Sequence, residues 1–212
     1  MNTPSAPTRL DRRKARTRQA LVDAAVRLIA EGRGDRASVQ EITEAADIGF
    51  GSFYNHFESK DQLFETASTE VLERWAAMID RASADLTDPA EVFSRSLRLS
   101  ARLSWTHPEV ARFITGAGLD LLDAEGGLAP RARRDIRAGQ AAGQFTVGEP
   151  EVALSAVAGG LIGLLRLHQQ HPEQVAETAG DDLAEACLRL LGLPAHKAKK
   201  LAHQPLPGAE PW

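Results

Sequence analysis

Residues 38–57, SVQEITEAADIGFGSFYNHF, decide how the N-terminal part of this chain folds. Ser38 and Glu41 have the spacing of a capping box, in which each side chain satisfies a free backbone N–H at a helix start. Apolar residues then recur at helical intervals, at Val39, Ile42 and Ala46. The stretch therefore predicts a short helix with one small apolar face.

A reversal and a second helix are expected next. Asp47 stands where the chain must turn, and Asp tolerates a left-handed backbone better than most residues. We expect Ile48 to fill the gap between the helices and Gly49 to be the N-cap of the second one. Phe53 and Phe57 are four residues apart and should face inward together. This layout is that of a helix-turn-helix, whose second helix enters the DNA major groove.

The remaining side chains of the second helix should point outward or sideways. Several can form hydrogen bonds with phosphates or base edges, and the set comprises Phe50, Gly51, Ser52, Tyr54, Asn55 and His56. A short surface helix without a partner is the alternative interpretation of the same pattern. The motif favours DNA recognition when it is taken with the features that follow.

Residues 12–66 resemble the N-terminal domain of tetracycline-repressor-like (TetR-family) transcription regulators. The matching pieces are RRKARTRQ, ALVDAAVRLIAEGRG and SVQEITEAADIGFGSFYNHFESKDQLFETA. FYNHFESKDQLF is the most specific of them, because it matches the family's join between recognition helix and fourth helix. Asp47 replaces the common turn glycine, Gly49 replaces the common Ser or Thr cap, and Phe50 stands where a polar or basic residue is frequent.

The resemblance implies contacts with DNA for particular residues. Phosphate contacts are expected from Tyr54, His56 and Lys60, and from Ser38 through the start of its helix. Two arginines of the first helix, Arg16 and Arg18, would add to them. The base-facing candidates are Phe50, Gly51, Ser52 and Asn55. The alternatives are that His56 packs under the fourth helix and that Tyr54 is a half-buried core ring.

Composition is that of a soluble globular protein. The chain has 212 residues, 43% of them hydrophobic and 25% charged. We expect no membrane span, because no apolar run approaches the roughly 18 residues required. The polar, basic N-terminus lacks the apolar segment of a signal peptide, so cytoplasmic residence is expected. Cys187 is the one cysteine, which excludes an intrachain disulfide and a Cys-rich metal site.

Charge is distributed unevenly along the sequence. The net charge is −4, but residues 1–36 hold nine Arg and Lys against four Asp and Glu, which gives +5 and leaves −9 for the rest. A basic end on an acidic molecule suggests a local site for nucleic acid. A solvated basic arm without a partner is the alternative.

The whole chain is predicted to be all-α, with about nine helices. A three-helix DNA-binding domain is followed by a larger helical domain for ligand binding and dimerisation, the latter by analogy with the fold. The helices of that larger domain are expected at about 89–105, 129–142, 150–168 and 181–191. A further helix is expected to begin at a start signal at Thr106. The expected division is a disordered arm (1–9), the helix-turn-helix domain (10–58), a connecting helix (59–81), the effector domain (82–195) and a flexible tail (196–212).

The helix at 150–168 is apolar almost all round, which indicates burial on more than one side. One short recognition helix contacts few bases, so a two-fold dimer that reads two half-sites is expected. The predicted dimer interface comprises Ala156, Gly159, Gly160, Gly163, Leu164, Leu183, Cys187 and Leu190. The alternative is a central core helix without a partner.

These features predict a regulator, most simply a repressor, that binds a palindromic double-stranded DNA operator as a homodimer. A small, largely apolar effector would release it, from a pocket for which the candidates are Trp75, Met78, Ser100, Trp105, Phe113 and His168. No catalytic residue, metal site or cofactor is predicted, since no HExxH, GxSxG or phosphate-binding glycine loop is present. The rival interpretations are a DNA-bound adaptor or architectural protein without a ligand, and a helical ligand-converting enzyme.

Overall fold

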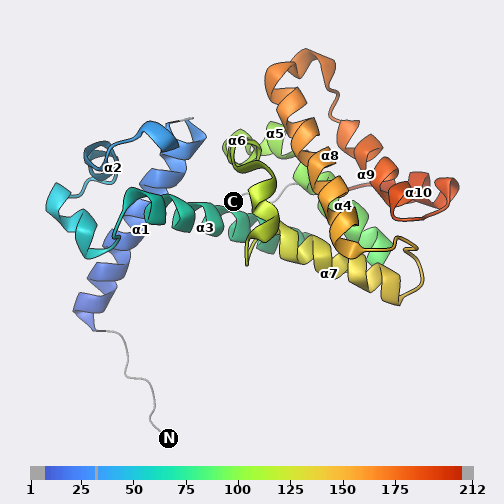
Figure 1. Cartoon of the computed structure of the whole chain (residues 1–212), viewed down its shortest axis with the longest axis horizontal. Helices are drawn as coiled ribbons and strands as arrows, with labels where there is room; N and C mark the ends of the chain where they lie inside the picture. The colour runs from blue at the N-terminus through green and yellow to red at the C-terminus, as the bar shows by residue number, and fades with distance from the viewer. Residues whose placement is uncertain (1–7, 32, 207–212) are drawn as a thin grey trace, which may run out of the picture. The chain divides into compact units, whose positions relative to one another are not determined.

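The computed structural model describes residues 8–31 and 33–206, and every regular element in these ranges is helical. The all-α prediction is therefore confirmed, with ten α-helices and four 3-10 helices in this part of the chain. Two compact units are present, Met1–Ser68 and Thr69–Trp212 (Figure 1). Each is described by itself below.

The first unit is built from short helices with well-defined starts. Its elements are α1 (Arg9–Ala30), η1 (Gly34–Arg36), α2 (Val39–Ala45), η2 (Phe50–Asn55) and the beginning of α3 (Lys60–Ala82). The predicted capping box is confirmed: the Glu41 backbone N–H donates to Ser38 Oγ at 3.2 Å, and the Ser38 N–H donates to Glu41 Oε2 at 2.8 Å. A second capping box, from Thr8 and Asp11, starts α1 inside the segment expected to be a disordered arm.

The turn between α2 and η2 follows the sequence prediction. Asp47 has φ 54° and is the one non-glycine residue with positive φ in the described ranges. Gly49 is the N-cap of η2, as predicted, with extended backbone. The second helix is a 3-10 helix and not an α-helix, and two glycines at its start, Gly49 and Gly51, account for its weak helical propensity.

One apolar core holds the first unit together. Phe53 and Phe57 are both buried, which confirms their predicted inward orientation, and they pack with Leu21, Ile42 and Leu63. Ile48 is partly buried against the same cluster, as expected for the residue between the helices. This packing leaves the opposite side of η2 facing outward.

The second unit surrounds a central helix. Its elements are the end of α3, α4 (Pro89–Ala101), α5 (Leu103–Thr106), α6 (Pro108–Ala117), η3 (Gly118–Asp123), α7 (Leu128–Ala141), α8 (Pro150–Gln170), η4 (Pro172–Gln174), α9 (Ala179–Leu190) and α10 (Ala195–Ala202). Helix α4 packs against α7, α8, α9 and α10 (Figure 1). Asp88 begins α4 by accepting hydrogen bonds from the N–H groups of Ala90 and Glu91.

A buried charge connects α4 to the C-terminal segment. Arg98 is 3% exposed, and its Nε lies 2.7 Å from Asp181 Oδ1 on α9. Its Nη2 donates to the carbonyl oxygen of Gln204 at 2.7 Å. Ser94 Oγ donates to the carbonyl oxygen of Leu201 at 3.2 Å. A buried ion requires such partners because its lost hydration must be replaced.

Two helix predictions were wrong in this unit. Thr106 does not cap α6: its hydroxyl donates to the carbonyl oxygen of Arg102, and His107 is the N-cap. The segment 196–202, expected to belong to a flexible tail, lies in α10, where Ala198, Leu201 and Ala202 are buried. Residues 207–212 of that tail and residues 1–7 of the expected arm lie outside the described residues.

Helix α8 was expected to be buried on more than one side, but its buried residues lie on one face. Within the described part of the chain it alone has the length and mean hydropathy of a membrane-spanning helix. In this fold it packs against α4, α6, α7 and α9, with Ala153, Leu154, Val157, Leu161 and Leu165 turned inward. Val152 and Leu167 of the same helix are exposed, so burial in the protomer accounts for only part of its apolar composition.

Candidate functional site

The outer side of η2 presents polar and aromatic groups. Phe53 is fully buried, whereas its neighbours Phe50 and Tyr54 are 54% and 59% exposed. The Phe50 and Tyr54 rings meet edge to face, with centroids 6.2 Å apart. Gly51 and Asn55 are also exposed. The residues predicted to face DNA bases are thus accessible on one short segment, with Ser52 half-buried beside them.

A basic cleft lies beside this surface in the same unit. It is lined by Asp11, Lys14, Ala15, Arg18, Asn55 and His56. Helix α1 supplies Lys14 and Arg18, and the Arg18 guanidinium carbon lies 4.8 Å from the centroid of the Phe57 ring. The cleft can receive an anion, because two fixed cations there outnumber one carboxylate.

His56 contributes an unsatisfied ring nitrogen to this cleft. Its Nδ1 is buried and has no hydrogen-bond partner within the described ranges. Burial lowers the pKa of His56 below its ordinary value, and the nearby charges of Lys14 and Arg18 lower it further. In the absence of a bound anion, the His56 imidazole is therefore mostly neutral at pH 7. An anion placed in the cleft would favour its protonation.

The other residues predicted to contact phosphate have local roles as well. The Ser38 hydroxyl takes part in the cap of α2 with Glu41. Lys60 Nζ lies 3.5 Å from the carbonyl oxygen of Ala37. Arg16 is exposed on α1 but is not among the residues that line the basic cleft, whereas Lys14, which was not predicted, does line it.

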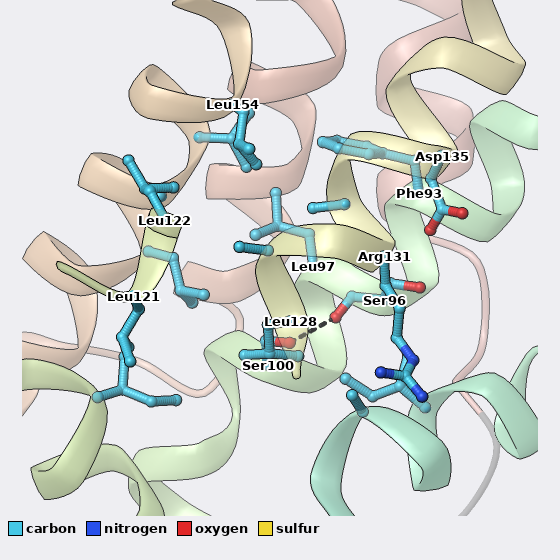
Figure 2. Close-up of a pocket in the computed structure, with 18 of the residues that line it drawn as sticks. Phe93, Ser96, Leu97, Ser100, Leu121, Leu122, Leu128, Arg131, Asp135 and Leu154 are labelled. Carbon is cyan, nitrogen blue, oxygen red and sulfur yellow. Dashed lines mark hydrogen bonds between the residues drawn. The ribbon is translucent and has the colours of Figure 1, made fainter. Parts of the chain in front are cut away.

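The second unit contains an apolar cavity (Figure 2). The space open to the centre of a water molecule is about 100 Å³. Helices α3, α4, α6, η3, α7 and α8 contribute its walls, mainly with aliphatic side chains, of which Ile79, Leu97, Leu121, Leu122, Leu128, Leu154 and Leu161 are examples. Phe93 supplies an aromatic face, and the hydroxyl of Ser100 donates to the carbonyl oxygen of Ser96 at 2.9 Å.

One wall of the cavity is charged. Arg131 on α7 donates from Nη2 and Nη1 to the two carboxylate oxygens of Glu73, at 2.7 and 2.9 Å. Its Nε donates to Asp80 Oδ2 at 2.6 Å. The Arg131 hydrogen bonds lower the pKa of Glu73 to about 2. This guanidinium is held by α3 carboxylates while its side chain lines the cavity.

Asp135 is the buried carboxylate of the same wall. It is 5% exposed, and Arg134 Nε donates to its Oδ1 at 2.8 Å. Burial raises the pKa of Asp135 above its ordinary value, although the neighbouring Arg134 acts in the opposite direction. Figure 2 labels Asp135 and Phe93 among the residues that line the cavity. A buried carboxylate with one guanidinium partner can accept a further hydrogen bond from a ligand hydroxyl.

Comparisons with known proteins agree with this two-part arrangement. A family model for tetR-family bacterial regulatory proteins matches residues 21–67, and one for the tetracyclin repressor-like C-terminal domain matches residues 88–204. The structure of RolR with its ligand resorcinol is 33% identical, covers 93% of this chain and 98% of that one, and superimposes with a TM-score of 0.74.

The chain belongs to the TetR family.

Two mycobacterial repressors of the helix-turn-helix type are similar over a shorter stretch. DhaR from Mycobacterium sp. (strain GP1) is 38% identical over 75 residues, which are 35% of this chain and 36% of DhaR. Rv1474c from Mycobacterium tuberculosis is 39% identical over 71 residues, which are 34% of this chain and 37% of that protein. The chain thus matches little more than a third of the length of these curated relatives.

In this member of the TetR family, the predicted pocket residues lie in the second unit. Of the six, Ser100 lines the cavity, and the others are absent from its walls. The Trp75 ring lies 5.1 Å from the His107 ring, and the Trp105 ring lies 4.1 Å from the His168 ring. Met78 and Phe113 are half-buried elsewhere in the unit. The residues missed from sequence include the aliphatic walls, the Phe93 ring and the charged side chains of Asp80, Arg131, Arg134 and Asp135.

The predicted dimer residues of this TetR-family chain lie on α8 and α9. Ala156, Gly159 and Gly163 are exposed on α8. Large apolar neighbours are exposed as well: Val152 by 68%, Leu167 by 44% and, on α9, Leu190 by 49%. Gly160, Leu164 and Leu183 are half-buried. Cys187 is buried within the protomer, and burial raises the pKa of its thiol to about 11.

The cavity and the cleft offer no site for a metal ion. Within the described ranges, no three His, Cys, Asp or Glu side chains gather closely enough to hold one.

Proposed function

We propose that the chain is a homodimeric repressor that binds a palindromic DNA operator and is released by a small hydroxylated aromatic effector. The observation that carries the proposal is the apolar cavity with a buried carboxylate on its wall. Ligand sites are typically apolar spaces with a few well-placed polar groups. The likeness to RolR, whose structure holds resorcinol, supports the ligand class.

The size of the cavity limits the effector. About 100 Å³ is open to the centre of a water molecule, and an apolar cavity of roughly 150 Å³ accepts benzene. Sites for drug-sized ligands run to roughly 300–1,000 Å³. A molecule with one aromatic ring is therefore favoured over a fused-ring or long-chain ligand. Phe93 would contact the ring, and Asp135 would accept a hydrogen bond from its hydroxyl.

The DNA contacts follow from the first unit. The basic cleft would hold a phosphate through Lys14, Arg18 and His56, and the predicted Tyr54, Lys60, Ser38 and Arg16 would contact the backbone around it. Phe50, Gly51, Ser52 and Asn55 would face the bases. Phosphate contacts position the protein, and contacts with base edges determine sequence preference.

Dimerisation would use the exposed apolar stripe of α8 and α9. The stripe of Val152, Ala156, Gly159, Gly163 and Leu167 lies along one face of α8, and Leu190 is exposed on α9. Exposed apolar area of this kind marks an interface. A two-fold pair would present two reading surfaces to two half-sites, in the cytoplasm where the operator lies.

Release requires that the effector bind one conformation more tightly than the other. A ligand shifts an equilibrium only by its difference in affinity for the two states. Linkage then demands reciprocity: the effector weakens operator binding by the same factor by which the operator weakens effector binding. The chain would bind the effector without converting it.

The experiment is a selection of binding fragments from genomic DNA, followed by footprinting and release. We expect a roughly palindromic protected site and loss of protection on addition of resorcinol or a related phenol. Asp135→Asn should keep operator binding and lose the response to the phenol. Sequence-specific binding without any response to phenols would support the adaptor alternative. Recovery of a chemically altered phenol would support an enzyme instead.

A further inference from the structure

A second hollow of the ligand-binding unit adjoins the apolar cavity. We call it the polar cleft, and its polar lining residues are Asp80, Ser83, Thr87, Arg134 and Asp135. Its space open to the centre of a water molecule is about 300 Å³. Asp80, Arg134 and Asp135 line both the polar cleft and the apolar cavity, so the two hollows share one wall.

Ser83 gives the polar cleft an unused hydrogen-bonding group. The residue is 6% exposed, and its Oγ is buried without a hydrogen-bond partner among the described residues. A buried hydroxyl left unpaired costs about 1–3 kcal/mol. Native proteins rarely leave such a group unpaired, unless a water molecule or a ligand satisfies it. A ligand hydroxyl can both donate to Ser83 Oγ and accept from it.

Arg134 is the mobile part of the wall that the two hollows share. The Arg134 side chain is 55% exposed, and its Nη2 lies 3.2 Å from Asp80 Oδ1. Exposed ion pairs contribute at most about 1 kcal/mol, because water competes for both partners. Arg134 Nε also donates to the buried Asp135 carboxylate at 2.8 Å, so movement of the Arg134 side chain would connect the two hollows when a ligand hydroxyl replaces it as the partner of Asp135.

We infer that the polar cleft is a second ligand subsite, which binds a hydroxyl on a short chain attached to the aromatic ring of the effector. This inference rests on the proposed function, which places the ring in the apolar cavity. The chain passes beside Arg134, and its terminal hydroxyl pairs with Ser83. The effector class is then a phenol that carries a short hydroxyalkyl substituent.

Two ligands of equal shape test the inference. In 2-propylphenol and 2-(2-hydroxyethyl)phenol, the chain leaves the ring next to the phenolic hydroxyl, on the side of the shared wall, and a terminal methyl group is exchanged for a hydroxyl. Calorimetric titration of the full chain gives the ratio of their Kd values. We expect Ser83→Ala to shift this ratio by about 3- to 10-fold against the hydroxyl compound, the effect of one lost hydrogen bond.

Ser104→Ala is the matched control. Ser104 is also buried with an unpaired Oγ among the described residues, but it lines neither hollow. We expect this variant to leave the ratio unchanged. Both variants remove an unpaired hydroxyl, so thermal unfolding should show no loss of stability.

Resorcinol separates failure of the inference from failure of the proposed function, because it fills the cavity without a side chain. If resorcinol binds but Ser83→Ala leaves the ratio of Kd values unchanged, the second subsite is wrong and the cavity assignment stands. The same conclusion follows if resorcinol binds and neither substituted phenol does. If resorcinol and both substituted phenols all fail to bind, the proposed effector class and the subsite fall together.

Discussion

Arg131 and Glu73 form a two-pronged ion pair between α7 and α3, with N–O distances of 2.7 and 2.9 Å. Glu73 also accepts a hydrogen bond from the backbone N–H of Gly127, at 2.9 Å. One carboxylate thus fixes both the start of α7 and the guanidinium that lines the cavity. Charge-assisted pairs with this geometry are stronger than single exposed contacts.

Replacing Glu73 should therefore weaken the fold in a pH-dependent way. We expect Glu73→Gln to lower the free energy of unfolding by on the order of 1 kcal/mol at pH 7, because the pair is partly exposed. The pKa of Glu73 is lowered from 4.5 to about 2, so the carboxylate stabilises the fold fully above pH 4.5. That contribution is lost as the pH falls from 4.5 towards 2.

Urea unfolding at several pH values between 7 and 3 measures this effect. The difference between wild type and Glu73→Gln should narrow as the pH falls below 4.5. Glu70→Gln is a suitable control, since the Glu70–Arg74 pair is an exposed contact within one helix. A constant difference across the range would contradict the assigned role of Glu73.

Phe53 and Phe50 should respond in opposite ways to truncation. Phe53 is fully buried, so Phe53→Ala should cost about 3–5 kcal/mol of stability and abolish specific DNA binding. Phe50 is 54% exposed, so Phe50→Ala should leave the melting temperature nearly unchanged while altering site preference. Thermal unfolding and a binding selection with each variant check both expectations. Destabilisation by Phe50→Ala comparable to that by Phe53→Ala would disprove the assigned orientation of η2.

Lys14 should contribute to DNA affinity without affecting sequence preference. If it neutralises one phosphate in the basic cleft, Lys14→Ala should reduce the slope of log K against log salt concentration by about 0.9. The affinities for the operator and for unrelated DNA should fall to a similar extent. Titrations by fluorescence anisotropy at four salt concentrations measure the slope. Asn55→Ala is the contrasting variant, for which we expect altered site preference and little change in slope.

Ala156→Arg should produce a monomer. Ala156 is exposed in the middle of the apolar stripe on α8, so a charged side chain there would oppose association without disturbing the protomer. Gly160→Arg is less suitable, because a Cβ at that position would lie 3.0 Å from Leu183 Cδ1 in the same protomer. Sedimentation velocity measures the mass, with Gln170→Arg as an exposed control on α8. A dimeric Ala156→Arg protein would exclude this face as the interface.

Sequence reasoning worked best where local contacts determine structure. The Ser38–Glu41 cap, the left-handed Asp47 and the inward Phe53 all depend on residues a few positions apart. The 3-10 form of η2 was not predicted, because spacing at three to four residues suits both helix types.

The ligand-binding unit was harder to predict because distant contacts determine it. Trp75 and Trp105 looked like pocket residues by composition, yet each ring contacts a histidine. Arg131, Arg134 and Asp135 were not predicted as pocket residues, because the ion pairs of the two arginines with Asp80 and Glu73 join residues more than 50 positions apart. Helix α10 looked like a tail, because its burial depends on α4 and α9.

The hydrogen bond from Arg98 to the carbonyl oxygen of Gln204 makes the packing of α4 depend on the C-terminal segment. Cleavage before residue 204 would take an acceptor away from a guanidinium that water can hardly reach. The damage would not stay local, because Arg98 shares α4 with Phe93, Leu97 and Ser100 of the cavity wall. A preparation clipped there would therefore lose its response to effector before any change in the DNA-binding residues.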